Sequence, residues 1–92
     1  MKYIFLGNIS PEWIGRHEER LQSCKAKADE LGMTFVAINY TQGIYDFIDA
    51  VEASDPSVVL VFSIWYAKQG YGKITTMPAF DEAEMEKAVQ AV

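Results

Sequence analysis

SDPSVVLVFSIWYAKQG, residues 54–70, is the stretch of sequence that decides the fold. Its valines favour a strand, and its near-continuous hydrophobicity hides any period that would distinguish a strand from a helix. The ends resolve the ambiguity, because Ser54 or Asp55 can cap a helix that begins with Pro56, and Gly70 can end one. The segment is also too long for an ordinary strand and suits a helix of about three to four turns. We predict a buried helix here.

A second helix is predicted between Ser10 and Gly32. Ser10-Pro11-Glu12 is typical of a helix start, and a glycine such as Gly32 commonly follows a helix end. Between them, one set of residues recurs at intervals of three and four positions, which places it on one side of a helix. The set is Ile14, His17, Leu21, Cys24, Ala28 and Leu31. The spacing predicts one amphipathic helix, and we expect His17, on its inward side, to be at least partly buried.

Segments rich in aromatic and β-branched residues predict strands. They are Tyr3–Ile9, Met33–Thr41, Tyr45–Ala53 and Lys73–Phe80. Gln42-Gly43 predicts a hairpin turn between the middle two, and Pro78 confines the last to a sheet edge or a strand end. Asp81 and the acids after it open a C-terminal helix. The order βαββαβ with an extra C-terminal helix predicts one α+β domain over residues 1–92, a ferredoxin-like sandwich.

The composition describes a folded, mildly acidic protein. Half of the 92 residues are apolar, and 13 acidic residues outnumber 8 basic ones, which gives a formal net charge of −5. This charge disfavours nucleic acid and anionic membranes as partners, since both are polyanionic. The longest uncharged apolar stretch, Val58–Ala67, is about half of the roughly 20 residues that span a bilayer. Cys24 is the only cysteine, which excludes an intrachain disulfide and fits the reducing cytoplasm.

The strands carry large apolar residues on both faces, which predicts self-association. Tyr3 and Phe5 alternate with Ile4 and Leu6 in the first strand, and the third strand alternates in the same way. A sandwich of this kind places both helices on one face of the sheet, so the other face would be exposed in a monomer. A patch of this size exceeds what soluble monomers usually tolerate. We therefore expect a homodimer, or a higher homo-oligomer built from dimers.

The sequence also resembles the GYD domain family, small proteins named for a Gly-x-Tyr-Asp signature. The signature falls on Gly43, Tyr45 and Asp46, and the run TTMPAF follows at residues 75–80. The resemblance extends over nearly the whole chain. In the decisive segment, three residues are bulkier than the small ones typical of the family, namely Phe62, Trp65 and Tyr66. The resemblance implies a ferredoxin-like fold of the dimeric α/β-barrel type, and it implies no established activity.

Two residues are candidate catalytic groups. His17 is the only histidine and could act as a general base near neutral pH. Alternatively, it is a half-buried histidine bonded to a backbone carbonyl or to water. Asp46 could have a raised pKa near an apolar sheet face, or could equally stabilise the turn by accepting backbone hydrogen bonds. We expect Gly43 to supply a positive φ in that turn.

Four further residues are candidate ligand contacts: Tyr40, Tyr45, Thr75 and Trp65. The tyrosines flank the turn, and the other two could present a hydroxyl and a ring to the space between sheet and helices. Interface, strand and core packing are the alternatives for these residues. We expect no metal centre, because only His17 is available beside a few acids. No glycine-rich loop opens a helix, and we expect no cofactor.

Three functions remain open. The first is a homo-oligomeric module, binding or regulatory, that holds a small, partly apolar molecule without turnover. The second is a small cofactor-independent enzyme of isomerase or monooxygenase type, in which His17 or Asp46 transfers a proton. The third is a structural assembly unit without a ligand. A water-accessible cavity shared by His17 and Asp46 would favour the enzyme, and an apolar cavity without them would favour binding.

Overall fold

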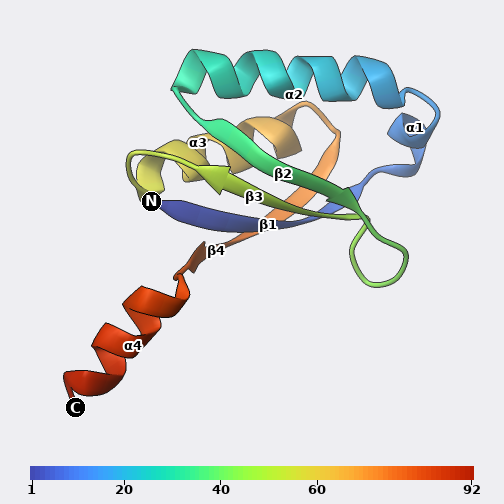
Figure 1. Ribbon diagram of the computed structural model, residues 1–92. Helices are drawn as coiled ribbons and strands as arrows, with labels where there is room; N and C mark the ends of the chain where they lie inside the picture. The colour runs from blue at the N-terminus through green and yellow to red at the C-terminus, as the bar shows by residue number, and fades with distance from the viewer.

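The computed structural model describes residues 1–92 and contains one antiparallel sheet with the strand order β2-β3-β1-β4. The strands are β1 (Lys2–Ile9), β2 (Thr34–Tyr40), β3 (Phe47–Glu52) and β4 (Gly72–Ala79). The helices are α1 (Pro11–Ile14), α2 (His17–Leu31), α3 (Pro56–Lys68) and α4 (Glu82–Gln90) (Figure 1). This order and this sheet confirm the predicted α+β fold, a ferredoxin-like sandwich with an extra C-terminal helix.

Helix α3 confirms the prediction for the decisive segment. Asp55 is its N-cap, and the Asp55 carboxylate accepts a hydrogen bond from the backbone N–H of Ser57 at 2.8 Å. Pro56 occupies the first turn, where its missing N–H leaves no bond unmade. The buried side of the helix carries Val59, Phe62 and Tyr66. Phe62 and Tyr66 are therefore core residues, and the third bulky residue, Trp65, is half-buried and packs against the core.

The helix predicted from Ser10 to Gly32 is divided in two. Helix α1 ends at Gly15, and Arg16 has a non-helical conformation with φ −120° and ψ 40° before α2 begins. A glycine inside a helix weakens it, and the ring of Trp13 is held against that of Tyr71, with centroids 4.5 Å apart. The short first helix is thus anchored separately.

This division changes which residues of α2 face inward. The buried residues are Arg20, Cys24 and Ala28, spaced four apart, and Leu21 is only half-buried. His17, at the first position of α2, is exposed. The expectation that His17 would be at least partly buried is therefore wrong, because the predicted stripe assumed one uninterrupted helix.

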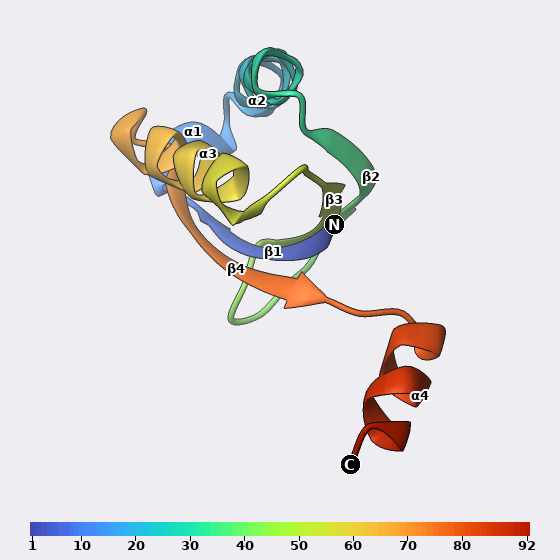
Figure 2. The same cartoon turned by 90° about the vertical axis from the view of Figure 1, so that its left-hand side faces the viewer.

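Helices α2 and α3 cover one face of the sheet, and the other face carries no helix (Figure 2). On the covered face, the rings of Phe5 and Phe62 stack with centroids 5.5 Å apart. Helix α4 extends away from the sheet (Figures 1 and 2). Its N-terminus has a complete capping box between Asp81 and Glu84. None of the helices has the length and apolar character needed to cross a membrane.

The connection from β2 to β3 is a longer loop than predicted. Strand β3 begins at Phe47, so Tyr45 and Asp46 lie in the loop instead of the strand. The Asp46 N–H donates to the carbonyl of Gly7 at 2.8 Å, and the Asp46 carboxylate accepts from the N–H of Ile9 at 2.7 Å. Gly43 has a φ of 149°, which confirms its expected positive φ. The signature residues Gly43 and Asp46 thus shape this loop and join it to the end of β1.

Candidate functional site

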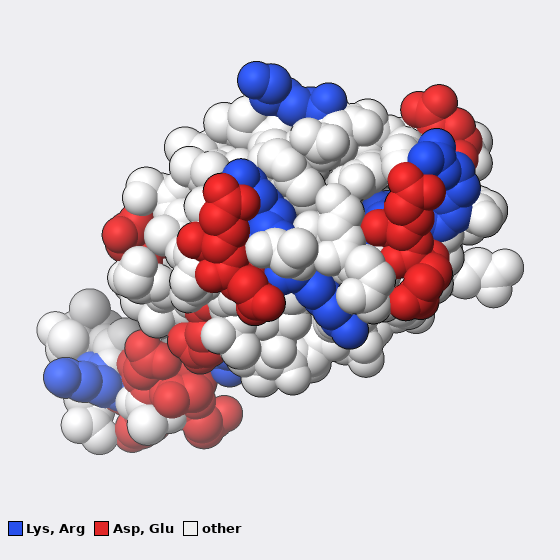
Figure 3. Space-filling view, turned by 90° about the horizontal axis from the view of Figure 1, so that it is seen from above, with Lys and Arg blue, Asp and Glu red and all other residues white.

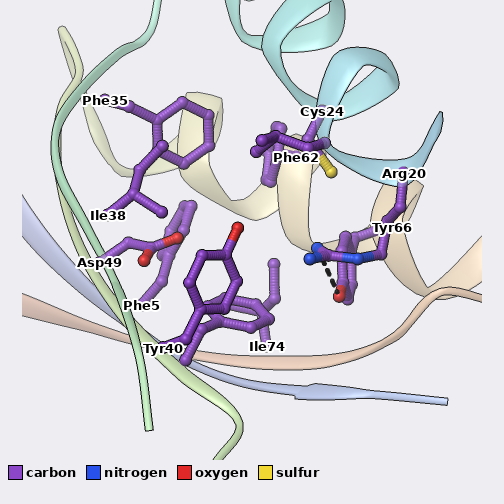
Figure 4. A pocket seen from close by; sticks show the side chains of 12 residues that line it. Phe5, Arg20, Cys24, Phe35, Ile38, Tyr40, Asp49, Phe62, Tyr66 and Ile74 are labelled. Atoms are coloured by element: carbon purple, nitrogen blue, oxygen red, sulfur yellow. Dashed lines mark hydrogen bonds between the residues drawn. The ribbon is translucent and has the colours of Figure 1, made fainter. Parts of the chain in front are cut away.

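A cavity lies between the sheet and the two helices α2 and α3 (Figure 4). Its walls are mainly apolar, and its free volume is about 20 Å³, which is room for one or two water molecules. The residues that line it are Phe5, Arg20, Leu21, Cys24, Phe35, Ile38, Tyr40, Phe47, Asp49, Phe62, Tyr66 and Ile74. A few polar groups in an otherwise aromatic lining are the usual composition of a small-molecule site.

Arg20 is the polar group that the helix side contributes. Its residue is 4% exposed, and its Nη1 donates to the hydroxyl of Tyr66 at 3.4 Å. The guanidinium carbon also lies 5.8 Å from the centre of the Phe47 ring. Nε and Nη2 are buried without any hydrogen-bond partner. A buried cation with unmade hydrogen bonds is costly, so this arrangement calls for an acceptor in the cavity.

On the outer surface of α2 and at its N-cap, unlike at Arg20, basic side chains are paired with acidic ones. There, Arg16 pairs with Glu19 at 2.8 Å, and Lys27 pairs with Glu30 at 3.2 Å. Figure 3 looks down on this surface and shows basic and acidic side chains side by side. Arg20 has no such partner, because it lies on the inward side of the same helix.

Asp49 is the polar group that the sheet side contributes. It lies between the buried Phe47 and Val51 on the inward face of β3, and it is 6% exposed. Its Oδ1 accepts a hydrogen bond from the N–H of Asn39 at 3.2 Å. Burial raises the pKa of Asp49 to about 6, although the bond from Asn39 and the charge of Arg20 act in the opposite direction. Asp49 and Arg20 form no ion pair.

Two further polar groups of the cavity, the Tyr66 hydroxyl and the Cys24 thiol, are protonated and uncharged at neutral pH. The Tyr66 hydroxyl donates to the carbonyl of Asn8 at 3.3 Å, and burial raises the pKa of Tyr66. Burial also raises the pKa of the Cys24 thiol to about 11, so a reactive thiolate is disfavoured. The charged groups of the cavity at neutral pH are therefore Arg20 and Asp49.

Tyr40 and His17 lie at the rim of the cavity. Tyr40 lines the cavity and is 48% exposed, at the last position of β2. Figure 4 shows its hydroxyl pointing inward. The rings of His17 and Tyr40 meet edge to face with centroids 5.2 Å apart. His17 thus touches the cavity only through Tyr40.

The other residues singled out from the sequence do not line this cavity. Asp46 and Tyr45 lie in the loop, and Thr75 is exposed on β4. Trp65 packs against Phe62, with centroids 5.4 Å apart. His17 and Asp46 therefore share no cavity, and their proton-transfer role stays a prediction. Nowhere do three His, Cys, Asp or Glu side chains gather where they could hold a metal ion.

The sequence contained signals for both charged residues of the site. Arg20, Cys24 and Ala28 are spaced four apart, so a break near Gly15 would have placed Arg20 on the inward side of α2. Asp49 has the same parity as the inward Phe47 and Val51. Charged residues are rarely buried, so a charged residue at an inward position of a strand or helix indicates a functional site.

Comparison with known proteins supports the fold and shows the family. The chain resembles 5-chloro-2-hydroxyhydroquinone dehydrochlorinase from Burkholderia phenoliruptrix AC1100, solved in complex with 2,5-dihydroxybenzoquinone, with a TM-score of 0.57, 11% identity, and coverage of 90% of this chain and 97% of that one. At this identity, the likeness shows the fold alone. No curated protein matches the sequence. The GYD domain matches residues 3–89, nearly the whole chain, so this protein belongs to the GYD domain family.

Proposed function

We propose that this protein is a homo-oligomeric module that binds a small organic anion in the cavity lined by Arg20. The observation that carries the proposal is the buried guanidinium, whose Nε and Nη2 have no partner. The two oxygens of a carboxylate would accept one hydrogen bond each from these two nitrogens, in the bidentate geometry that guanidinium groups favour. The aromatic walls would hold the apolar part of the same ligand.

The free volume of about 20 Å³ is too small for an organic ligand, so binding requires Tyr40 to move. Tyr40 is suited to this movement, because its side chain is half-exposed and makes no hydrogen bond. Its contact with the exposed His17 ring is a single edge-to-face contact, of about 0.5–1.5 kcal/mol. We infer that Tyr40 swings outward to admit the ligand.

The fold neighbour supports this assignment in one respect. That dehydrochlorinase was solved with a small hydroxylated ring compound bound, so a sandwich of this type can hold a ligand of that size. A binding role for our chain without turnover is the simpler inference. His17 and Asp46, the residues that the enzyme hypothesis needs, do not meet in a cavity.

The oligomer that we propose uses the sheet face without helices. Two rows of side chains cross this face along the pairing register. One row is Ala37, Ala50, Ile4 and Met77, and the next is Asn39, Ile48, Leu6 and Thr75. The centre of the face is therefore apolar, while Lys2 and Glu52 lie opposite one another at one end. An apolar centre with a charged rim is typical of an interface between protomers.

Helix α4 offers further apolar surface for the same partner. Met85, Val89 and Val92 follow one another at intervals of four and three positions and are all exposed. A second copy of the chain would cover both surfaces. We also retain the reducing cytoplasm as the proposed compartment, supported by the buried, unpaired thiol of Cys24.

The experiment is a calorimetric titration with benzoate, a flat organic anion, using the wild type and Arg20→Leu. We expect benzoate to bind both the wild type and Tyr40→Gly. Binding should be tighter to Tyr40→Gly, because this variant lacks the side chain that closes the entrance to the cavity. We expect Arg20→Leu to lose binding, while Arg16→Leu, which removes an exposed arginine of the same segment, retains it. Circular dichroism checks that each variant is folded. Equal binding of benzoate to the wild type and Arg20→Leu would overturn the proposal. The absence of binding by benzoate and by every hydroxylated benzoate, to both the wild type and Tyr40→Gly, would overturn it as well.

A further inference from the structure

The cavity contains a second charged residue, Asp49, to which the proposed function assigns no contact with the anion. Asp49 faces the cavity from β3, while Arg20 faces it from α2 (Figure 4). Asp49 Oδ1 is occupied by the N–H of Asn39, and Oδ2 makes no hydrogen bond to the protein. One acceptor on the sheet side is therefore available to a ligand, and on the helix side two buried donors lack a partner.

Two buried opposite charges in one cavity would ordinarily pair with each other. Here they do not, although both are almost fully buried. A ligand that satisfies both must be an acceptor at one end and a donor at the other. An anion without a donor would leave Asp49 unsatisfied and would bring a second negative charge close to it.

We propose that the ligand is a small hydroxylated organic anion, whose anionic oxygen binds Arg20 and whose hydroxyl donates to Asp49. This inference rests on the proposed function and assigns Asp49 as the residue that selects the hydroxyl. Asp49 is suited to the task because an ionised carboxylate is a stronger acceptor than any neutral oxygen. The surrounding rings of Phe5, Phe35 and Phe62 favour a flat apolar body between the two polar groups.

A zwitterion with an ammonium group is the main competitor, and the lining disfavours it. An ammonium group carries three donors and needs three acceptors when it is buried. Most of the residues around Asp49 are apolar. A hydroxyl needs only the single acceptor that Asp49 Oδ2 provides.

The test compares ligands that share one ring and differ in one group: benzoate, 3-hydroxybenzoate, 4-hydroxybenzoate and 3-(aminomethyl)benzoate. Dissociation constants are measured at pH 7.5 for the wild type, Tyr40→Gly, Asp49→Asn and Glu52→Gln. The last variant removes an exposed carboxylate of the same strand, outside the cavity, and is the matched control.

We expect one hydroxybenzoate to bind the wild type or Tyr40→Gly roughly 10-fold or more tightly than benzoate, since a site built for a hydroxyl rejects its absence. Asp49→Asn reduces this advantage to roughly 3-fold or less, because an amide is a weaker acceptor. Glu52→Gln leaves the advantage intact.

Equal binding of benzoate and both hydroxybenzoates, with dependence on Arg20, would overturn the role of Asp49 and leave the proposed function standing. Tightest binding of 3-(aminomethyl)benzoate would overturn the ligand class in favour of a zwitterion. Absence of binding by every probe would overturn the proposed function itself.

Discussion

Asp49 and Arg20 line the same cavity from the sheet and from a helix, and no ion pair joins them. Each is almost fully buried, Arg20 with two nitrogens that have no hydrogen-bond partner and Asp49 with a pKa that burial raises. Such an arrangement lowers the free energy of unfolding, and proteins retain it mainly at functional sites. The cost of burying Asp49 can be measured as the change in the free energy of unfolding when its charge is removed.

Replacing Asp49 with Asn should stabilise the protein at pH 7.5. The pKa of Asp49 is raised from 3.8 to about 6 in the folded protein, so folding favours the protonated form. The associated stability is present below pH 4 and is lost as the pH rises through about 6. Asn keeps an oxygen for the N–H of Asn39 and carries no charge. We expect an increase of about 1–3 kcal/mol, from about 1.4 kcal/mol per pKa unit.

Urea denaturation of both proteins between pH 4 and pH 8 checks this prediction. The groups that face Asp49 are Arg20 and Cys24 from α2, Tyr66 from α3 and Tyr40 from β2. They are common to both proteins, so the difference in unfolding free energy isolates Asp49. The difference should be largest above pH 6 and should shrink toward pH 4. A difference that grows as the pH falls would contradict the raised pKa.

Replacing Gly7 with Ala should destabilise the protein strongly. A Cβ at this position would lie 1.9 Å from Cζ of Phe47, the residue paired with Gly7 across β1 and β3. The Phe47 ring is buried against Tyr66 and cannot move aside freely. We expect a loss of about 3 kcal/mol, at the upper end of overpacking. Because Phe47 also lines the cavity, benzoate binding should weaken as well.

Gly15→Ala is the matched control for Gly7→Ala. A Cβ at Gly15 meets nothing within 4 Å, and φ is −77°, which alanine adopts readily. Chemical denaturation should show Gly15→Ala to be neutral or stabilising by about 0.5–1 kcal/mol. Equal effects of the two substitutions would mean that the contact between Gly7 and Phe47 is not close.

The sequence predicts the elements of this fold well, because each has local signals at its ends. Asp55, Pro56 and Gly70 identify α3 despite its strand-forming valines. Pro78 restricts β4 to a sheet edge or a strand end, and β4 is an edge strand. The charged residues of the site were missed for a different reason. The inward orientation of Arg20 depends on a break between Gly15 and Arg16, which is stabilised by the distant contact of Trp13 with Tyr71. Asp49 shares its face of β3 with Phe47 and Val51, so its orientation follows from strand alternation. Helix phase set by tertiary packing is not a local property of the sequence.

The loop glycine Gly43 should tolerate neither Ala nor Asn. Its φ of 149° lies far from the left-handed helical value that Asn accepts, although a Cβ there would meet no atom within 4 Å. Gly32, with φ 72° and ψ 23°, does have that conformation and is the comparison. We expect both Gly43 variants to lose roughly 1–3 kcal/mol. In denaturation experiments, Gly32→Asn should be milder than Gly32→Ala, and a similarly mild Gly43→Asn would contradict the backbone argument.

The proposed dimer face is tested by placing a charge at its centre. Ile48 is paired with Leu6 in the middle of the helix-free face and is 37% exposed in the protomer, so Ile48→Asp spares the core. In a dimer, the new carboxylate would be buried without a partner. We expect self-association to weaken on the order of 100-fold or more, with unchanged circular dichroism.

Sedimentation equilibrium at micromolar concentration measures this effect, with Val61→Asp as the control. Val61 is apolar, is 47% exposed and belongs to α3. Helix α3 covers the face of the sheet opposite the proposed interface (Figure 2). A charge there removes a similar amount of exposed apolar surface and should leave the dimer intact. If the wild type sediments as a monomer, or if both variants dissociate alike, the helix-free face is not the interface between protomers. If only Ile48→Asp dissociates, the apolar rows that cross the four strands are the surface that a second copy covers.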